Sequence, residues 1–207
     1  MATTTTLTAT ATAQINYTYT KTDNTAGWAT NEQQLVSQIT SFTAGDGANK
    51  AESVYREAFS VTSGSPNKDF DLFGSLTDVF GDTINIEQLK VIFVKNSSTT
   101  AGDLLYVGPL GASNPLLAPF MDADGGVVVQ PGGSFFLNAP REGFSITATA
   151  QTVRVQYQGS SATIAVEAVF IGSAGDLESS SSSSQSSLSI SFSSSSSSST
   201  SSISSQG

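Results

Sequence analysis

The stretch from Leu7 to Thr20 reads LTATATAQINYTYT and alternates strictly between two kinds of residue. A repeat of two residues is typical of a β-strand, because successive side chains point to opposite faces. At about 3.3 Å per residue this strand would reach roughly 45 Å, longer than most strands of a compact domain. One interpretation is ordinary core strands or a Thr-rich end; the other is an arm that adds a strand to a neighbouring subunit. The residues predicted to share one face of such an assembly arm are Leu7, Ala9, Ala11, Ala13, Ile15, Tyr17 and Tyr19.

Composition divides the 207-residue chain into three parts. The first thirty residues contain twelve threonines, and residues 179–207 contain 21 serines. We therefore predict an N-terminal arm over residues 1–30, one core domain over residues 31–175 and a low-complexity tail over residues 176–207. The tail has too few apolar residues to offset its ordering entropy, so disorder is expected. Trp28, the only tryptophan, lies between arm and core and is expected to pack the arm onto the core.

The core sequence predicts eight or nine short strands and no long helix. The pattern of Asn31 to Phe42 is ambiguous, because Leu35, Ile39 and Phe42 suit a helical face and Val36, Gln38, Thr40 and Phe42 suit a strand; a strand is the preferred prediction. Leu76 to Phe80 is predicted as a single helical turn. The segment Ile84 to Val94 is predicted to carry a β-bulge at Glu87-Gln88 and to be covered on both faces. Residues 153–157 and 164–170 are predicted to form a hairpin. We expect an all-β antiparallel sandwich, a jelly roll, with an extended N-terminal strand arm and a disordered Ser-rich tail.

Composition also excludes several classes of function. The chain has no cysteine and no histidine, so disulfides, His/Cys zinc sites and the histidine-based serine triad are ruled out. The net charge of −9, without basic clusters, disfavours direct binding of nucleic acid. No apolar run reaches the length of a membrane span, and no secretory signal is recognised. We expect a protein that is not an enzyme and needs no cofactor.

Few residues remain as candidates for chemistry. Asp122 and Asp124 resemble part of a calcium loop, but a third acidic position and a distant bidentate glutamate are missing, so a solvated turn is the main interpretation. Asp69 and Asp71 share a strand face and could serve a glycosidase, although an exposed face explains them more simply. The glycines of residues 131–133 and 108 fit tight turns rather than a phosphate loop.

Several segments occur in the same order as in a family of tailed-bacteriophage virion proteins, which the chain resembles over roughly residues 40 to 172. They are Thr43 to Glu52, Phe70 to Leu72, Gly74 to Ile84, Val91 to Asn96, Thr100 to Asp103, Val129 to Gly133, Leu137, Ala139-Pro140 and the terminal strand Ala165 to Gly172. The resemblance implies a structural component of the phage particle, in the head or in the tail. It implies no catalytic residues, and it does not extend to the arm or the tail of the chain.

From these observations we expect a capsid decoration protein located in the virion and made in the host cytoplasm. Its expected partners are further copies of itself, with a trimer as one form, and other virion proteins such as the major capsid protein. The alternative is a host-surface glycan-binding module of a tail or head fibre, acting through the loop from Gly108 to Pro119. A hydrolase that depends on carboxylates is the third hypothesis.

Overall fold

The computed structural model describes residues 7–23, 28–78, 81–159 and 161–174, with the side chains of all of these except 15–23 and 28–37. The regular secondary structure in these ranges consists of β-strands, and every strand pair is antiparallel. The predicted all-β antiparallel class is therefore confirmed. The chain divides into a unit of Met1–Asp176 and a unit of Leu177–Gly207. The second unit contains nearly all of the predicted Ser-rich tail, residues 176–207. It lies outside the described residues.

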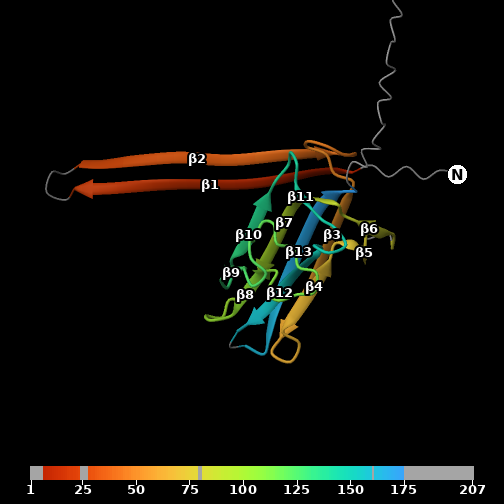
Figure 1. Cartoon of the computed structure of the whole chain (residues 1–207). Helices are drawn as coiled ribbons and strands as arrows, with labels where there is room; N and C mark the ends of the chain where they lie inside the picture. The colour runs from red at the N-terminus through yellow and green to blue at the C-terminus, as the bar shows by residue number, and fades with distance from the viewer. Residues whose placement is uncertain (1–6, 24–27, 79–80, 160, 175–207) are drawn as a thin grey trace, which may run out of the picture. The chain divides into compact units, whose positions relative to one another are not determined.

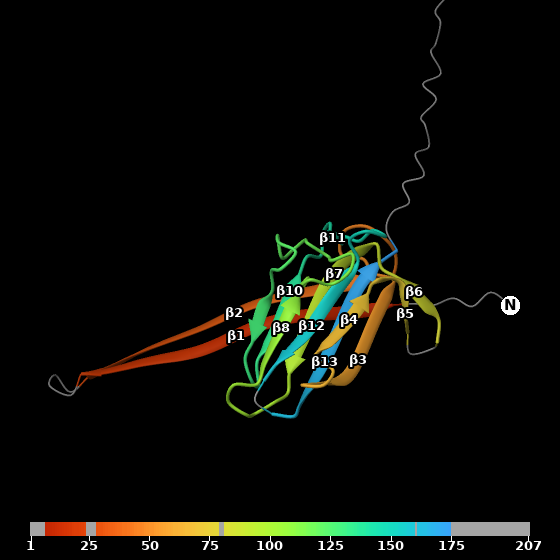
Figure 2. The ribbon, with the colours of Figure 1, turned by 60° about the horizontal axis from the view of Figure 1, so that its bottom comes forward.

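Two sheets form a sandwich (Figures 1 and 2). The first has the order β10-β7-β13-β3, with the short strand β11 also paired to β7. Its strands are β3 (Ser53–Thr62), β7 (Gln88–Asn96), β10 (Ser134–Asn138), β11 (Phe144–Ser145) and β13 (Thr163–Ser173). The second sheet has the order β4-β12-β8-β9. Its strands are β4 (Asn67–Asp71), β8 (Leu104–Gly108), β9 (Val127–Val129) and β12 (Thr152–Gln158).

The strand order is compatible with the predicted jelly roll. Four antiparallel pairs are nested along the chain: β3 with β13, β4 with β12, β7 with β10 and β8 with β9. A long antiparallel ribbon whose pairs are nested in this way forms two facing sheets when it rolls up, which is the architecture of a jelly roll. Two short strands, β5 (Phe73–Thr77) and β6 (Thr83–Asn85), form a separate small sheet.

Apolar side chains from both sheets meet in one core. Phe70 of β4 and Phe170 of β13 lie with ring centroids 5.0 Å apart, and both are fully buried. Strand alternation explains this arrangement, because one face of each strand can point inward while the other points out. The inward residues predicted in the last two strands, apart from the half-buried Tyr157, are all buried: Val153, Val155, Ile164, Val166, Ala168 and Phe170.

The predicted hairpin between residues 153–157 and 164–170 is wrong in its pairing. The two strands, β12 and β13, exist, but they belong to different sheets. β12 pairs with β4 and β8, whereas β13 pairs with β3 and β7. The connection between them therefore crosses from one sheet to the other instead of closing a two-stranded turn. Alternation of residue type reports which face is buried and says nothing about which strand lies alongside.

Two further predictions need correction. Leu76 lies in β5 and is buried there, so it is not part of a helical turn; Val79 and Phe80 lie outside the described residues. Residues 84–94 do not form one strand with a bulge at Glu87-Gln88, because β6 ends at Asn85 and β7 begins at Gln88. The bulge lies within β7 instead, at Lys90, where the register with β13 steps from Ile171↔Val91 to Gly172↔Leu89.

The N-terminal region forms a hairpin of its own (Figure 1). β1 (Thr8–Asp23) pairs with β2 (Trp28–Thr43) in an unbroken register from Thr8↔Thr43 to Asp23↔Trp28. The strand predicted over Asn31 to Phe42 is thus confirmed. The predicted arm boundary at residue 30 falls inside β2. At about 3.3 Å per residue, each 16-residue strand is roughly 50 Å long.

Candidate functional site

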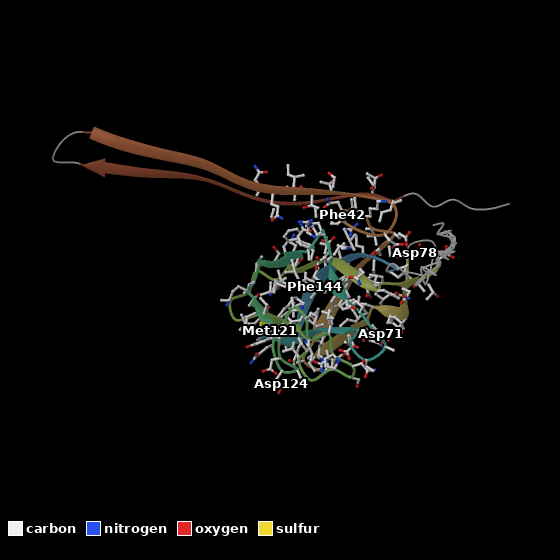
Figure 3. The ribbon with its side chains drawn as sticks, turned by 45° about the horizontal axis from the view of Figure 1, so that its top comes forward. Phe42, Asp71, Asp78, Met121, Asp124 and Phe144 are labelled. Carbon is white, nitrogen blue, oxygen red and sulfur yellow. The ribbon has the colours of Figure 1, made fainter. Side chains whose placement is uncertain are left out.

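The base of the hairpin packs on the outer face of the first sheet. Phe42 has no exposed surface and lies against Ala51, Val91 and Ile171 (Figure 3). Ala11 is also buried in this cluster, and Leu7 and Ala9 are partly buried beside it. On the other strand of the hairpin, Thr40 accepts a hydrogen bond from the Asn138 amide at 2.8 Å. The residues 7–14 and 38–43 therefore form a second, smaller core between hairpin and sandwich.

This packing explains why β7 is apolar on both faces. Ile92 and Val94 point into the sandwich core, whereas Val91 belongs to the cluster under the hairpin. The prediction that both faces of this strand are covered is confirmed. The sequence left open whether such a strand is central in a sandwich or lies under a partner; β7 is central in its sheet, and the cover on its outer face is the chain's own hairpin.

A groove of about 650 Å³ remains beside the hairpin base. One wall is the run Thr10 to Gln14 of β1, and none of the described side chains of β2, residues 38–43, lines the groove. The floor is the outer face of the first sheet, with Val91 and Phe93 of β7 among its apolar side chains. The other residues of the floor are Ser134, Phe136, Val169 and Ile171. Because β2 occupies the opposite side of β1, the groove runs along the edge of β1 that is not paired to β2.

The structure changes the interpretation of the predicted assembly arm. Its first part, through Ala11, packs on the chain's own sandwich, so these side chains are not free to clasp a neighbour, whereas Ala13 lines the groove. Ile15, Tyr17 and Tyr19 lie farther along β1, and their side chains are outside those described. Trp28 was expected between arm and core, but the register places its backbone opposite Asp23 at the turn end of the hairpin. Trp28 therefore lies at one end of β2 and Phe42 near the other, and Phe42 anchors the hairpin instead.

The Asp122–Asp124 segment is a hydrogen-bonded turn. The Asp124 amide donates to Oδ1 of Asp122 at 3.2 Å, and the Gly125 amide donates to the Asp122 carbonyl at 3.1 Å. Both carboxylates are exposed. Among the described residues, no group of three or more acidic side chains is placed to hold a metal ion. The geometry fits the solvated turn rather than a calcium loop.

A calcium titration checks this interpretation. We expect millimolar Ca²⁺ to leave the melting temperature unchanged, because two exposed carboxylates on one turn supply fewer oxygen ligands than the six to eight that Ca²⁺ takes. Differential scanning calorimetry with and without calcium measures it, with Asp124→Asn as the matched variant. A calcium-dependent rise in melting temperature that Asp124→Asn abolishes would contradict the expectation.

Asp69 and Asp71 serve local structure. Asp69 forms a bidentate pair with Arg154, with Nε to Oδ1 at 2.6 Å and Nη2 to Oδ2 at 2.8 Å. These hydrogen bonds raise the pKa of the Arg154 guanidinium above its ordinary value. Asp71 accepts from the Phe73 amide and from the Ser75 hydroxyl. Each carboxylate is thus engaged by a neighbouring strand or turn, and the two do not form a paired acid and base.

The Arg154 pair gives a stability prediction. We expect Arg154→Gln to lower the free energy of unfolding by about 1 kcal/mol, because Nη1 also donates to the Leu110 carbonyl at 3.1 Å and the side chain is mostly buried. The matched control is Arg56→Gln, whose partner Glu167 is also on a neighbouring strand but whose own side chain is 66% exposed. Urea unfolding of both variants measures the difference; equal losses would contradict the prediction.

A buried polar network was missed from the sequence. Asn96 is fully buried; its amide donates to the carbonyls of Asp103 and Val129 at 2.7 and 3.2 Å, and its Oδ1 accepts from the Ser98 amide at 3.0 Å. Asp103, also fully buried, accepts from the Ser98 hydroxyl at 2.6 Å and from the Ser161 amide at 2.9 Å. The network joins the turn after β7 to the connection before β13. No local pattern distinguishes such buried polar residues from exposed ones.

Lys90, at the bulge of β7, is another buried polar residue that the sequence did not single out. Its ammonium donates to the Arg141 carbonyl at 2.8 Å, beside a pocket of about 440 Å³. Gln88, Glu142 and Ser173 also line this pocket.

Comparison with known proteins adds no assignment. A scan against protein-family models gives no match for this chain, and neither does a search of curated proteins. Among the described residues, none forms a helix long and apolar enough to cross a membrane. Any functional conclusion therefore depends on the residues and the geometry of the chain itself.

Proposed function

We propose that the chain is a non-enzymatic structural protein of a bacteriophage virion, a capsid decoration protein that assembles through the β1–β2 hairpin. The observation that carries this proposal is the length of the hairpin relative to its packed base. The described side chains that contact the sandwich come from residues 7–14 and 38–43. The ladder continues for nine further residue pairs, from Ile15↔Val36 to Asp23↔Trp28.

Physical chemistry favours a partner for that extension. An isolated two-stranded ribbon is marginally stable in water, and a third strand or a packed face is needed for independent stability. Among the described residues, β1 and β2 pair with each other and with no other strand, so each has an edge available. Strand edges are templates for pairing with another chain. A hairpin of this length therefore suits an element that is completed on assembly.

The virion context of this proposal rests on the resemblance of the ordered segments to those of tailed-phage structural proteins. The absence of histidine and cysteine, with both strand aspartates engaged in local hydrogen bonds, supports a role without catalysis. The low fraction of charged residues, 12%, suits a surface that packs against other subunits. Copies of this chain and the major capsid protein are the proposed partners.

The glycan-binding alternative receives no such support. It requires an aromatic ring free to stack on a sugar, and the aromatic residue beside the loop is Phe120. That ring is half-buried and lies 6.1 Å, centroid to centroid, from Phe135. The exposed large apolar side chains in and just after the loop are Leu117 and Met121, and neither is a sugar platform.

Labelling of phage particles tests the proposed function. An antibody raised against the folded chain is applied to purified particles of the phage that encodes it, and gold-labelled particles are imaged. We expect label over the heads of intact particles. Label confined to the tail would favour the host-binding alternative, and absence of the chain from purified particles would refute the structural role.

A further inference from the structure

The groove beside the hairpin combines two features that single out one kind of ligand. Its wall is the edge of β1 over Thr10 to Gln14, and its floor is the apolar outer face of the first sheet. An extended strand laid in it would form main-chain hydrogen bonds with the wall and bury alternate side chains on the floor. We propose that the groove receives β1 of a second copy, paired antiparallel to β1 about a two-fold axis. This inference rests on the proposed assembly function and specifies the surfaces through which two copies of the chain make contact.

The sequence of β1 favours a second copy as the occupant. Natural edge strands are protected from pairing by lysine, proline, bulges or charges. Between Leu7 and Thr20 the chain has no charged residue and no proline, and the ladder with β2 has no register shift. Although the net charge of the chain is −9, pairing two copies along this edge brings no like charges into direct contact. The edge is open to a strand of the same composition.

Two-fold pairing also matches the two halves of β1. The axis that relates neighbouring antiparallel strands of a sheet is perpendicular to the sheet, so both ribbons keep the same face toward the same side. Because facing residues of antiparallel strands point to the same side, an axis at Gln14 would place residues 10–14 of one copy opposite residues 14–18 of the other, and the reverse. In the sequence, Ile15, Tyr17 and Tyr19 continue the phase of Ala11 and Ala13, which lie toward the floor. Larger side chains would thus meet the part of the floor that the alanines leave open.

The arrangement is closed. Each copy offers its groove once and its distal β1 once, and the two contacts are equivalent, as in an isologous dimer. The result is a four-stranded ribbon in the order β2-β1-β1-β2, which supplies the additional strands that an extended two-stranded ribbon needs. The contact continues the surface that the hairpin base already covers in its own chain, over Val91 and Ile171.

Filling the groove tests the proposal. Ser134 is exposed and lines the groove, so Ser134→Arg should block the incoming strand without removing any apolar packing. Ser60 is exposed on the outer face of the same sheet and does not line the groove, so Ser60→Arg is the matched control. Sedimentation equilibrium should show a dimer for the wild type and for Ser60→Arg. For Ser134→Arg we expect a dissociation constant raised about tenfold or more. A monomeric wild type, or equal affinity in all three proteins, overturns the proposal.

Cross-linking tests which edge is used. The chain has no cysteine, so one introduced thiol is unique. Gln14 lies near the proposed axis on β1. Gln38 is exposed on β2, where it is the register partner of Ala13, the residue next to Gln14. With a short bismaleimide, Gln14→Cys should give a covalent dimer and Gln38→Cys should stay monomeric. Cross-linking of Gln38→Cys in place of Gln14→Cys overturns the assignment to β1.

The two proposals fail in different ways. If particles carry the chain and Ser134→Arg still dimerises like the wild type, the groove contact is wrong and the decoration role stands. If particles lack the chain, the decoration role is wrong whatever the dimer affinity.

Discussion

Phe42→Ala should lower the free energy of unfolding by about 3 to 5 kcal/mol, the usual cost of truncating a buried phenylalanine. Phe42 has no exposed surface, and it is the largest of the buried side chains in the cluster that holds the hairpin on the sandwich. Its removal leaves a cavity between Ala51, Val91 and Ile171, which cannot collapse without moving β7 and β13. Urea unfolding followed by circular dichroism gives the loss of free energy.

The control for Phe42→Ala comes from the same strand. Ile39 lies three residues away in β2, and its side chain is 66% exposed. Ile39→Ala should change the free energy of unfolding by less than about 0.5 kcal/mol. Hydrogen exchange adds a second readout, since loss of the anchor should speed exchange of the β1 and β2 amides more than that of β12. Equal losses in the two variants would show that Phe42 does not anchor the hairpin.

Asn96→Leu should cost about 3 kcal/mol or more. Leucine is close in size to asparagine, so the change removes hydrogen bonds without opening a large cavity. It leaves the carbonyls of Asp103 and Val129 and the Ser98 amide without their partner at a site with no exposed surface. Each buried polar group that loses its partner costs about 1 to 3 kcal/mol. The loss should be visible as a lower urea midpoint with an unchanged slope.

Asn67→Leu is the control for the network. Asn67 is exposed on the edge strand β4, where water can replace any hydrogen bond of the side chain. Its substitution should shift the free energy of unfolding by less than about 0.5 kcal/mol. A loss at Asn96 no larger than at Asn67 would mean that the network adds nothing to stability.

Local patterns predicted the strands and their buried faces. The inward residues from Val153 to Phe170 follow from alternation, and the burial of residues 91–94 on both faces follows from their continuous apolar run, because face is a property of each strand. The pairing partners of the strands do not follow from local patterns. Gly159 and its neighbours signal a turn, and neither the turn nor the alternation states that β13 enters the other sheet.

The candidate site was predicted in part. The alternation from Leu7 to Thr20 predicted the strand β1, but the partner of that strand was sought in another subunit when β2 lies next in the chain. Asn31 to Phe42 had an ambiguous pattern because Phe42 belongs to a cluster assembled from β1, β2, β7 and β13. Asn96 and Asp103 carried no signal, since their burial depends on strands far apart in sequence.

Shortening the hairpin tests the central claim, assembly through β1 and β2, most directly. Gln14 and Ser37 are register partners, so replacing residues 15–36 by Asn-Gly closes the ladder with a two-residue turn and keeps the packed base. We expect a folded protein with nearly the wild-type melting temperature, which sediments as a monomer and fails to decorate particles that lack the native chain. Wild-type occupancy of those particles by the shortened protein would contradict the account.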